Sequence, residues 1–301
     1  MPLRLTEQQH DKAANIDTLD SHSILETLLD GQTDAVNAVR SAIPSIQKAA
    51  QLMTDTLSNQ GVLTYTGAGS SGLLGLTDGL ELPGTFGISL NAIRILLAGG
   101  EASLSDLAGN YEDDEILAQR DATAIDAKDC IIAISASGST AYPLAIAKAA
   151  RKKGAQVIGI SNTANSPLLD LSDIPVLLPT PAEVIAGSTR MGAGSAQKVA
   201  LNMMSTLMGI QLGHVHDGYM VNLHADNQKL LDRASRIVAA ITHCSIEQAL
   251  TSLTQSNGSV KQAIVMIAGQ CDLGHSKQIL EAANQNLRLA ISQFESGASS
   301  I

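Results

Sequence analysis

One local unit occurs twice in the chain: a short apolar run, a loop rich in serine and glycine, and then a helical pattern. The first run covers residues 62–66 and leads into Gly67-Ala68-Gly69-Ser70-Ser71-Gly72. The second covers residues 130–134 and leads into Ser135-Ala136-Ser137-Gly138-Ser139-Thr140. Short apolar strands that alternate with helices indicate an α/β fold, a parallel sheet covered by helices on both faces. Both loops then lie at the carboxyl ends of strands, where such sheets bind ligands.

The rest of the chain divides around this sheet. Further strands are predicted over residues 156–160 and 174–178, and a long helix over 188–212. Residues 1–57 read as an N-terminal helical arm, in which Ser21 or Ser23 is expected to cap a helix. After residue 225 the pattern is helical only, with helices predicted over 230–241, 245–253, 260–268 and 276–289. We therefore predict three parts: 1–57, 58–225 and 226–301.

The composition excludes several classes of protein. The chain of 301 residues is 45% hydrophobic and carries a net charge of −10, which fits a folded globular protein. Acidic charge and only two Phe, four Tyr and no Trp argue against nucleic acid as a partner. No apolar stretch is long enough to suggest a membrane span, and the N-terminus lacks a signal-peptide core. Three cysteines without a CxxC pattern suggest reduced thiols and a cytoplasmic location.

The two loops have the chemistry of a phosphate cradle. A helix N-terminus offers unpaired N–H groups and a partial positive charge, glycine allows close approach, and hydroxyls add donors. The candidate phosphate-binding residues are Ser70, Ser71, Ser135, Ser137, Ser139 and Thr140. The alternative is that serine and glycine here only make turns and helix caps. Neither loop fits a dinucleotide or P-loop fingerprint, so no nucleotide cofactor is expected.

Several further motifs resemble those of bacterial N-acetylmuramic acid 6-phosphate etherases, which have the sugar isomerase (SIS) fold. They cover nearly the whole chain and include Thr66-Gly67-Ala68-Gly69-Ser70-Ser71-Gly72, Glu81-Leu82-Pro83-Gly84-Thr85-Phe86, Ala98-Gly99-Gly100, Gly187-Ser188-Thr189-Arg190 and Ala196-Gln197-Lys198. Glucokinase regulatory proteins share the stretch from Glu183 to Arg190. The resemblance implies a small all-helical C-terminal domain, a homodimer and a role in cell-wall sugar recycling. It also implies that Ser188, Thr189 and Arg190 contact the substrate.

The resemblance further implies a lyase that removes D-lactate from C3 of the substrate without a metal or cofactor. Glu81 and Glu112 fall at the family's two carboxylate positions. Glu81 is the expected acid for the departing lactate, and Glu112 the expected base for the C2 proton. Two carboxylates and a phosphate in one cleft repel, which is expected to raise the pKa of one glutamate. Read without the resemblance, Glu112 is better explained as an acidic residue at a helix start, where the macrodipole favours it.

This chain departs from the family pattern at four positions. Typical etherases carry Arg where this chain has Leu73 and Ser139, Lys where it has Gly192, and commonly Lys or Arg where it has His214. Two explanations stay open: drift at positions that never touched substrate, or a changed substrate. The alternatives to an etherase are therefore a non-catalytic sugar-phosphate sensor and a sugar-phosphate isomerase. The pair His214 and His216 could suggest a metal, but no second cluster completes a site, and none is expected.

Overall fold

The structure, a computed structural model, describes residues 5–106, 110–223, 225 and 228–297. Contacts divide the chain into two compact units: Met1–Leu80 with Leu90–Leu207, and Glu81–Ser89 with Met208–Ile301. This division differs from the predicted boundaries at 57/58 and 225/226. Helix α2 (Ile43–Ser58) contacts three strands of the sheet, so the N-terminal helices join the sheet in the first unit.

The first unit contains a parallel sheet of five strands in the order β2-β1-β3-β4-β5. The strands are β1 (Leu63–Gly67), β2 (Ile93–Leu97), β3 (Cys130–Ile134), β4 (Gln156–Ser161) and β5 (Ile174–Leu177). Four of them confirm the predicted strands to within one residue. Strand β2 was not predicted, because it lies at the sheet edge, is largely half-buried and carries the charged Arg94.

The register brings three loops to one edge of the sheet. Gly67, the last residue of β1, pairs with Leu97 of β2 and with Ile134 of β3. The chain segments that follow these three strands therefore leave the sheet side by side. They are the two Ser-rich loops and the Ala98-Gly99-Gly100 turn.

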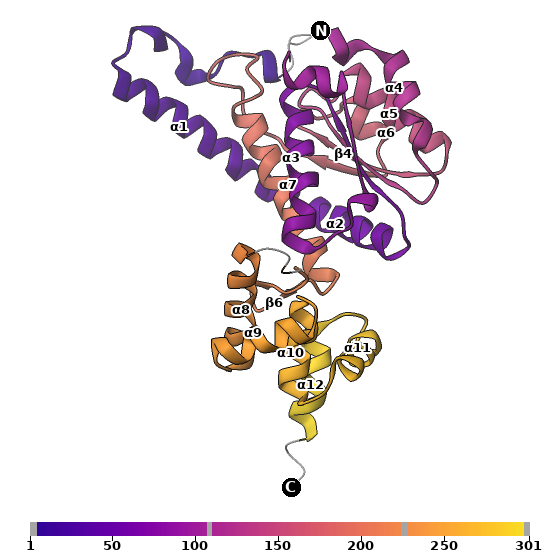
Figure 1. Ribbon diagram of the computed structural model, residues 1–301. Helices are drawn as coiled ribbons and strands as arrows, with labels where there is room; N and C mark the ends of the chain where they lie inside the picture. Colours follow the sequence, from indigo (N-terminus) through magenta and orange to yellow (C-terminus); the bar gives the residue numbers. More distant parts are fainter. Residues whose placement is uncertain (1–4, 107–109, 224, 226–227, 298–301) are drawn as a thin grey trace. The chain divides into compact units, whose positions relative to one another are not determined.

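Helices cover both faces of this sheet (Figure 1). One face carries α2, α3 (Gly69–Phe86) and α7 (Gly192–Gln211); the other carries α4 (Glu115–Asp121), α5 (Ala141–Lys152) and α6 (Pro167–Leu171). Alternate strand residues serve the two layers: Tyr65 contacts α3, while Ile131 and Ala133 belong to the core under α5. Every residue of β1 and β3 is buried; β3 reads as a continuous apolar run, whereas β1 also buries Thr64 and Thr66.

The N-terminal segment forms short 3-10 helices over Leu5–Glu7, Asp11–Ala13 and Ile16–Thr18, then α1 (Ser21–Ala38). The predicted serine cap is wrong: the Asp20 carboxylate accepts hydrogen bonds from the backbone N–H groups of His22 and Ser23. Asp20 is the N-cap, and Ser21 and Ser23 lie within the first turn of the helix.

The second unit contains a small hairpin, β6 (Val215–His216) with β7 (Tyr219–Met220), and a helical bundle. Its helices are α8 (Gln228–Thr242), α9 (Ile246–Gln255), α10 (Val260–Gly269), α11 (Leu273–Ala282) and α12 (Leu287–Gly297). The helix predicted over 276–289 is wrong, since Asn284 and Gln285 have left-handed backbones that separate α11 from α12. Across the described ranges, no helix is long and apolar enough to cross a bilayer.

Candidate functional site

Four of the predicted phosphate-binding residues form one hydrogen-bonded network after β3. The Ser135 hydroxyl lies 2.9 Å from the Thr140 hydroxyl and 3.4 Å from that of Ser137. The Ser137 hydroxyl also accepts from the Ser139 hydroxyl at 3.1 Å. Ser135 is buried, whereas the other three are half-buried and reach the surface of the loop. The loop therefore presents a tight group of hydroxyls, as a phosphate cradle requires.

The backbone of this loop makes a turn that requires glycine at position 138. Gly138 has φ of +64°, and a Cβ there would lie 2.2 Å from the Ser166 Oγ. Its N–H donates to the Ser135 hydroxyl at 3.1 Å. Thr140 then begins α5 without a side-chain cap, so the first N–H groups of this helix remain open to an anion.

Ser71 makes a hydrogen bond within the protein. Its hydroxyl donates to Oε1 of Gln197 at 2.9 Å, and Gln197 Nε2 donates to Oδ1 of Asn162 at 2.8 Å. The Asn162 backbone N–H donates to the carbonyl of Ala136 in the cradle loop at 3.0 Å. Gln197 and Asn162 are fully buried. This chain of hydrogen bonds connects the two Ser-rich loops. In it, the Ser71 hydroxyl donates its proton to Gln197 and not to a ligand.

Ser70 and Arg190 line a common pocket of about 310 Å³ on the surface between α3 and α7, which we call the α3–α7 pocket. Its lining residues are Ser70, Leu73, Leu74, Thr77, Arg190, Gly194, Ser195 and Lys198. Arg190 is exposed and Lys198 half-buried. The pocket thus combines two cationic side chains with two leucines in an otherwise acidic protein.

A glutamate side chain of the protein caps the N-terminus of α7. The buried Glu183 carboxylate accepts from the backbone N–H groups of Gly192 and Ala193, each at 2.8 Å. Ser188 and Thr189 lie in the turn just before this helix and are half-buried. Because Glu183 takes the helix N–H groups, any anion near this turn depends on side chains such as Arg190.

Asp78 is a buried carboxylate that sequence reasoning missed. Its oxygens accept from the hydroxyls of Tyr65 at 3.0 Å and Ser205 at 3.1 Å, and from the amide of Asn202 at 3.1 Å. Burial raises the pKa of Asp78 above its usual value, and the nearby Lys198 ammonium opposes this shift. No local signal in the sequence marks it, because its partners lie on β1 and α7.

Glu112 lies in the 3-10 helix η7 (Asn110–Asp113), with an exposed side chain. The ring of the preceding Tyr111 packs against Gly99, where a Cβ would lie 2.5 Å from the ring. Gly99 follows β2 at the edge of the sheet that carries the cradle. Glu112 lies in the first turn of η7, as the alternative of an acidic helix start expects. Asp114 caps the following helix α4, where its carboxylate accepts from the Leu117 N–H at 2.8 Å.

Glu81 lies near the end of α3 and is exposed. It belongs to the second compact unit, whereas Glu112 belongs to the first, so the pairing of these carboxylates stays a prediction. Within the second unit, the Glu81–Ser89 segment is firmly held. The carbonyl of Phe86 accepts from the Asn222 amide at 2.9 Å, and the His214 ring also hydrogen-bonds to the Phe86 backbone.

The four departures from the family pattern have four different surroundings. Leu73 lines the α3–α7 pocket, and Ser139 donates to Ser137 in the cradle. Gly192 is buried, with its Cβ position 3.0 Å from the Cβ of Ala35, so glycine suits the close packing on α1. Burial and the nearby Lys261 lower the pKa of His214 to about 4, which leaves its ring neutral at pH 7. Of these four positions, Leu73 lies at the α3–α7 pocket and Ser139 in the cradle loop.

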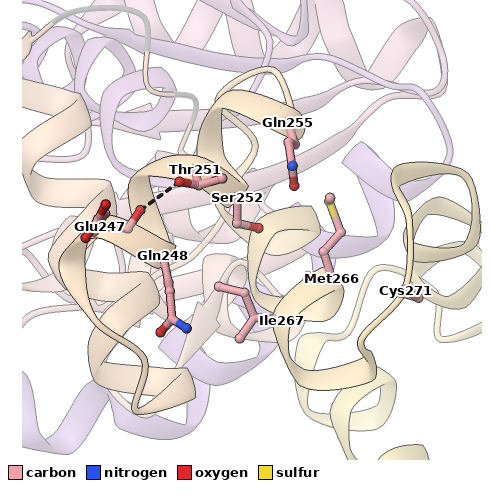
Figure 2. Close-up of a pocket in the computed structure, with 8 residues that line it drawn as sticks. All are labelled: Glu247, Gln248, Thr251, Ser252, Gln255, Met266, Ile267 and Cys271. Atoms are coloured by element: carbon pink, nitrogen blue, oxygen red, sulfur yellow. Dashed lines mark hydrogen bonds between the residues drawn. The ribbon is translucent and has the colours of Figure 1, made fainter.

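Two pockets of the helical unit differ from the α3–α7 pocket in the residues that line them. One of about 360 Å³ lies between α9 and α10 (Figure 2), and its lining includes Glu247, Met266 and Cys271 but no lysine or arginine. Burial raises the pKa of the Cys271 thiol, so it is a poor nucleophile. Another, of about 920 Å³, is lined by Lys229, Arg233 and Arg236 of α8. In the described part of the chain, no three His, Cys, Asp or Glu side chains gather into a metal site.

The fold and the hydroxyl-lined loops define an SIS-domain protein, and the SIS domain family matches residues 31–162. The solved structure of a Bacteroides fragilis protein involved in capsule formation has the same fold. It gives a TM-score of 0.51 at 19% identity over 65% of this chain and 95% of that one.

Close relatives then identify the family. A protein from Deinococcus radiodurans named N-acetylmuramic acid 6-phosphate etherase is 39% identical over 294 residues, which are 97% of this chain and 96% of the relative. A protein of the same name from Geobacillus thermodenitrificans is 38% identical over 95% of this chain and 98% of the relative. The chain belongs to the N-acetylmuramic acid 6-phosphate etherase family.

Proposed function

We propose that this protein is a carbon–oxygen lyase that cleaves the D-lactyl ether of N-acetylmuramic acid 6-phosphate. The products are N-acetylglucosamine 6-phosphate and D-lactate. The observation that carries this proposal is the hydroxyl network of Ser135, Ser137, Ser139 and Thr140 at the uncapped start of α5, in a chain of this family. Such a cradle suits the phosphate of a sugar phosphate because it combines hydroxyl donors with a helix N-terminus.

The reaction needs an acid and a base rather than a cofactor. After the sugar ring opens, Glu112 removes the C2 proton, and the C3–O bond breaks with its electron pair leaving on the lactate oxygen. Glu81 protonates that oxygen. It then takes a proton from the water that adds to C3, while C2 regains a proton. The exposure of both side chains leaves them accessible to a substrate.

The cradle and the α3–α7 pocket supply binding. We assign the phosphate to the loop of Ser135–Thr140, and we assign Ser70, Ser188, Thr189 and Arg190 as further contacts to the substrate. Ser71 acts instead through Gln197, which holds the first Ser-rich loop against the second. Tyr111, packed on Gly99, anchors the Glu112 segment near the cradle's edge of the sheet.

We also propose that the protein works as a homodimer in the cytoplasm, in recycling of cell-wall sugars. Helix α1 carries an apolar stripe of Leu25, Leu29 and Val36, which are 64%, 66% and 39% exposed. A stripe at helical spacing on the surface suits contact with another apolar surface. All three cysteines are free, as a reducing compartment would keep them.

One experiment separates this function from its alternatives. The protein is incubated with N-acetylmuramic acid 6-phosphate in D₂O, and D-lactate and deuterium at C2 are measured. We expect lactate together with C2 label. Label without lactate would favour an isomerase, and binding without either product would favour a sensor.

A further inference from the structure

The α3–α7 pocket has a different chemistry from the phosphate cradle. The cradle offers hydroxyls and open N–H groups, which suit a phosphate. The pocket offers a guanidinium and an ammonium beside two leucines. From this contrast we propose that the pocket binds the lactyl group of the substrate, and that Lys198 recognises its carboxylate. This inference rests on the proposed function and adds a specificity-determining residue to it.

The charge of the substrate requires such a second site. N-acetylmuramic acid 6-phosphate carries a phosphate at C6 and a carboxylate on the C3 substituent, at separate places on the sugar. The N-terminus of α7 is not available to the carboxylate, because Glu183 already binds the Gly192 and Ala193 N–H groups. Recognition of a second anion in this pocket therefore falls to Arg190 and Lys198.

Lys198 lies near a buried carboxylate. It interacts electrostatically with the buried Asp78, whose carboxylate is held by Tyr65, Asn202 and Ser205. Lys198 is half-buried, so less water competes for its ammonium than on an open surface. Arg190, by contrast, is exposed and pairs with no carboxylate among the residues that the structure describes.

Leu73 and Leu74 supply the complementary apolar part of the pocket. A lactyl group has a methyl beside its carboxylate, and the two leucines suit that methyl.

The test compares a ligand that has the lactyl group with one that lacks it. Steady-state kinetics give KM for N-acetylmuramic acid 6-phosphate, and product inhibition gives Ki for N-acetylglucosamine 6-phosphate. For Lys198→Met we expect KM to rise about tenfold or more, the usual effect of losing a charge-assisted hydrogen bond. Ki should stay within about twofold, because the product keeps the phosphate and has no carboxylate. Lys198→Arg should recover most of the affinity.

The controls separate failure of this inference from failure of the proposed function. Lys148→Met makes the same chemical change at an exposed position on α5 and should change neither constant. If KM and Ki rise together in Lys198→Met, Lys198 serves the phosphate or the fold, and the inference is wrong. It is also wrong if neither constant changes, or if Arg233→Met in the α8 pocket raises KM while Lys198→Met does not. Absence of lactate release by the unmodified protein would instead contradict the proposed function.

Discussion

The hydroxyl of Ser71 donates a 2.9 Å hydrogen bond to the side-chain oxygen of Gln197, which lies 126 residues further along the chain. The side-chain amide of Gln197 donates in turn to the side-chain oxygen of Asn162. The backbone N–H of Asn162 donates to the Ala136 carbonyl of the cradle loop. A chain of hydrogen bonds through two buried amide side chains therefore connects the two Ser-rich loops.

Replacing Gln197 with leucine should destabilise the connection between the two Ser-rich loops. The change removes the partners of Ser71 and Asn162, and each unpaired buried polar group costs about 1–3 kcal/mol. We expect the free energy of unfolding in urea to fall by about 2–4 kcal/mol and Ki for N-acetylglucosamine 6-phosphate to rise. As a milder change, Ser71→Ala removes the Ser71 bond and leaves the bond from Gln197 to Asn162 in place. Equal losses in the two variants would show that the bond between Gln197 and Asn162 does not matter.

Gly138→Ala should damage the cradle more than an ordinary glycine substitution. A left-handed backbone costs an alanine about 1–2 kcal/mol, and the new methyl would also meet Ser166 Oγ at 2.2 Å. Gly100→Ala is the matched control, because Gly100 has φ of +56° and no neighbour within 4 Å of its Cβ position. Thermal unfolding should show the larger loss for Gly138→Ala. A loss no greater than that of Gly100→Ala would mean that Ser166 can move aside.

Replacing each of the two proposed catalytic glutamates should have a different effect on C2 exchange and lactate release. Glu112→Gln should lower both the C2 exchange in D₂O and lactate release, because proton removal comes first. Glu81→Gln should lower lactate release but leave part of the C2 exchange. A positioned acid or base contributes about 10²–10⁴-fold, so both losses are measurable by NMR and lactate assay. Loss of exchange in Glu81→Gln with full exchange in Glu112→Gln would reverse the two roles.

His214 should make stability depend on pH in the mildly acidic range. Its pKa is about 4 in the folded chain, because its ring is buried, against 6.5 ordinarily. Between these values the unfolded chain binds a proton that the folded chain does not, so stability falls as pH falls from about 6.5 towards about 4. The full loss is about 3 kcal/mol, from about 1.4 kcal/mol per pKa unit.

Urea unfolding of His214→Gln at about pH 7 and about pH 5 measures this contribution. The variant should lose less stability between the two pH values than the unmodified protein. His22→Gln, at an exposed position on α1, is the control and should keep the original pH dependence. An unchanged pH dependence in His214→Gln would contradict the predicted role.

Local patterns in the sequence determined the strand, loop and helix units, because buried parallel strands are mostly short runs of apolar and β-branched residues. They also marked Ser135, Ser137, Ser139 and Thr140, which lie close together in the sequence and need only one loop to meet. Local patterns missed β2, whose half-buried edge position weakens the apolar signal. Yet β2 brings Gly99, and with it Tyr111 and the Glu112 segment, to the edge of the sheet that carries the cradle.

Only the tertiary structure decided which polar groups meet across long separations in the chain. Asp78 meets Asn202 and Ser205, Glu183 caps a helix nine residues later, and the Ser71 hydroxyl meets Gln197. A side chain's own neighbours in sequence do not reveal such partners, because a buried polar group is satisfied by whatever the fold packs against it. The sequence alone therefore identified the family and the cradle. The packing of α3 on α7 decided that Lys198 and Leu73 share a pocket.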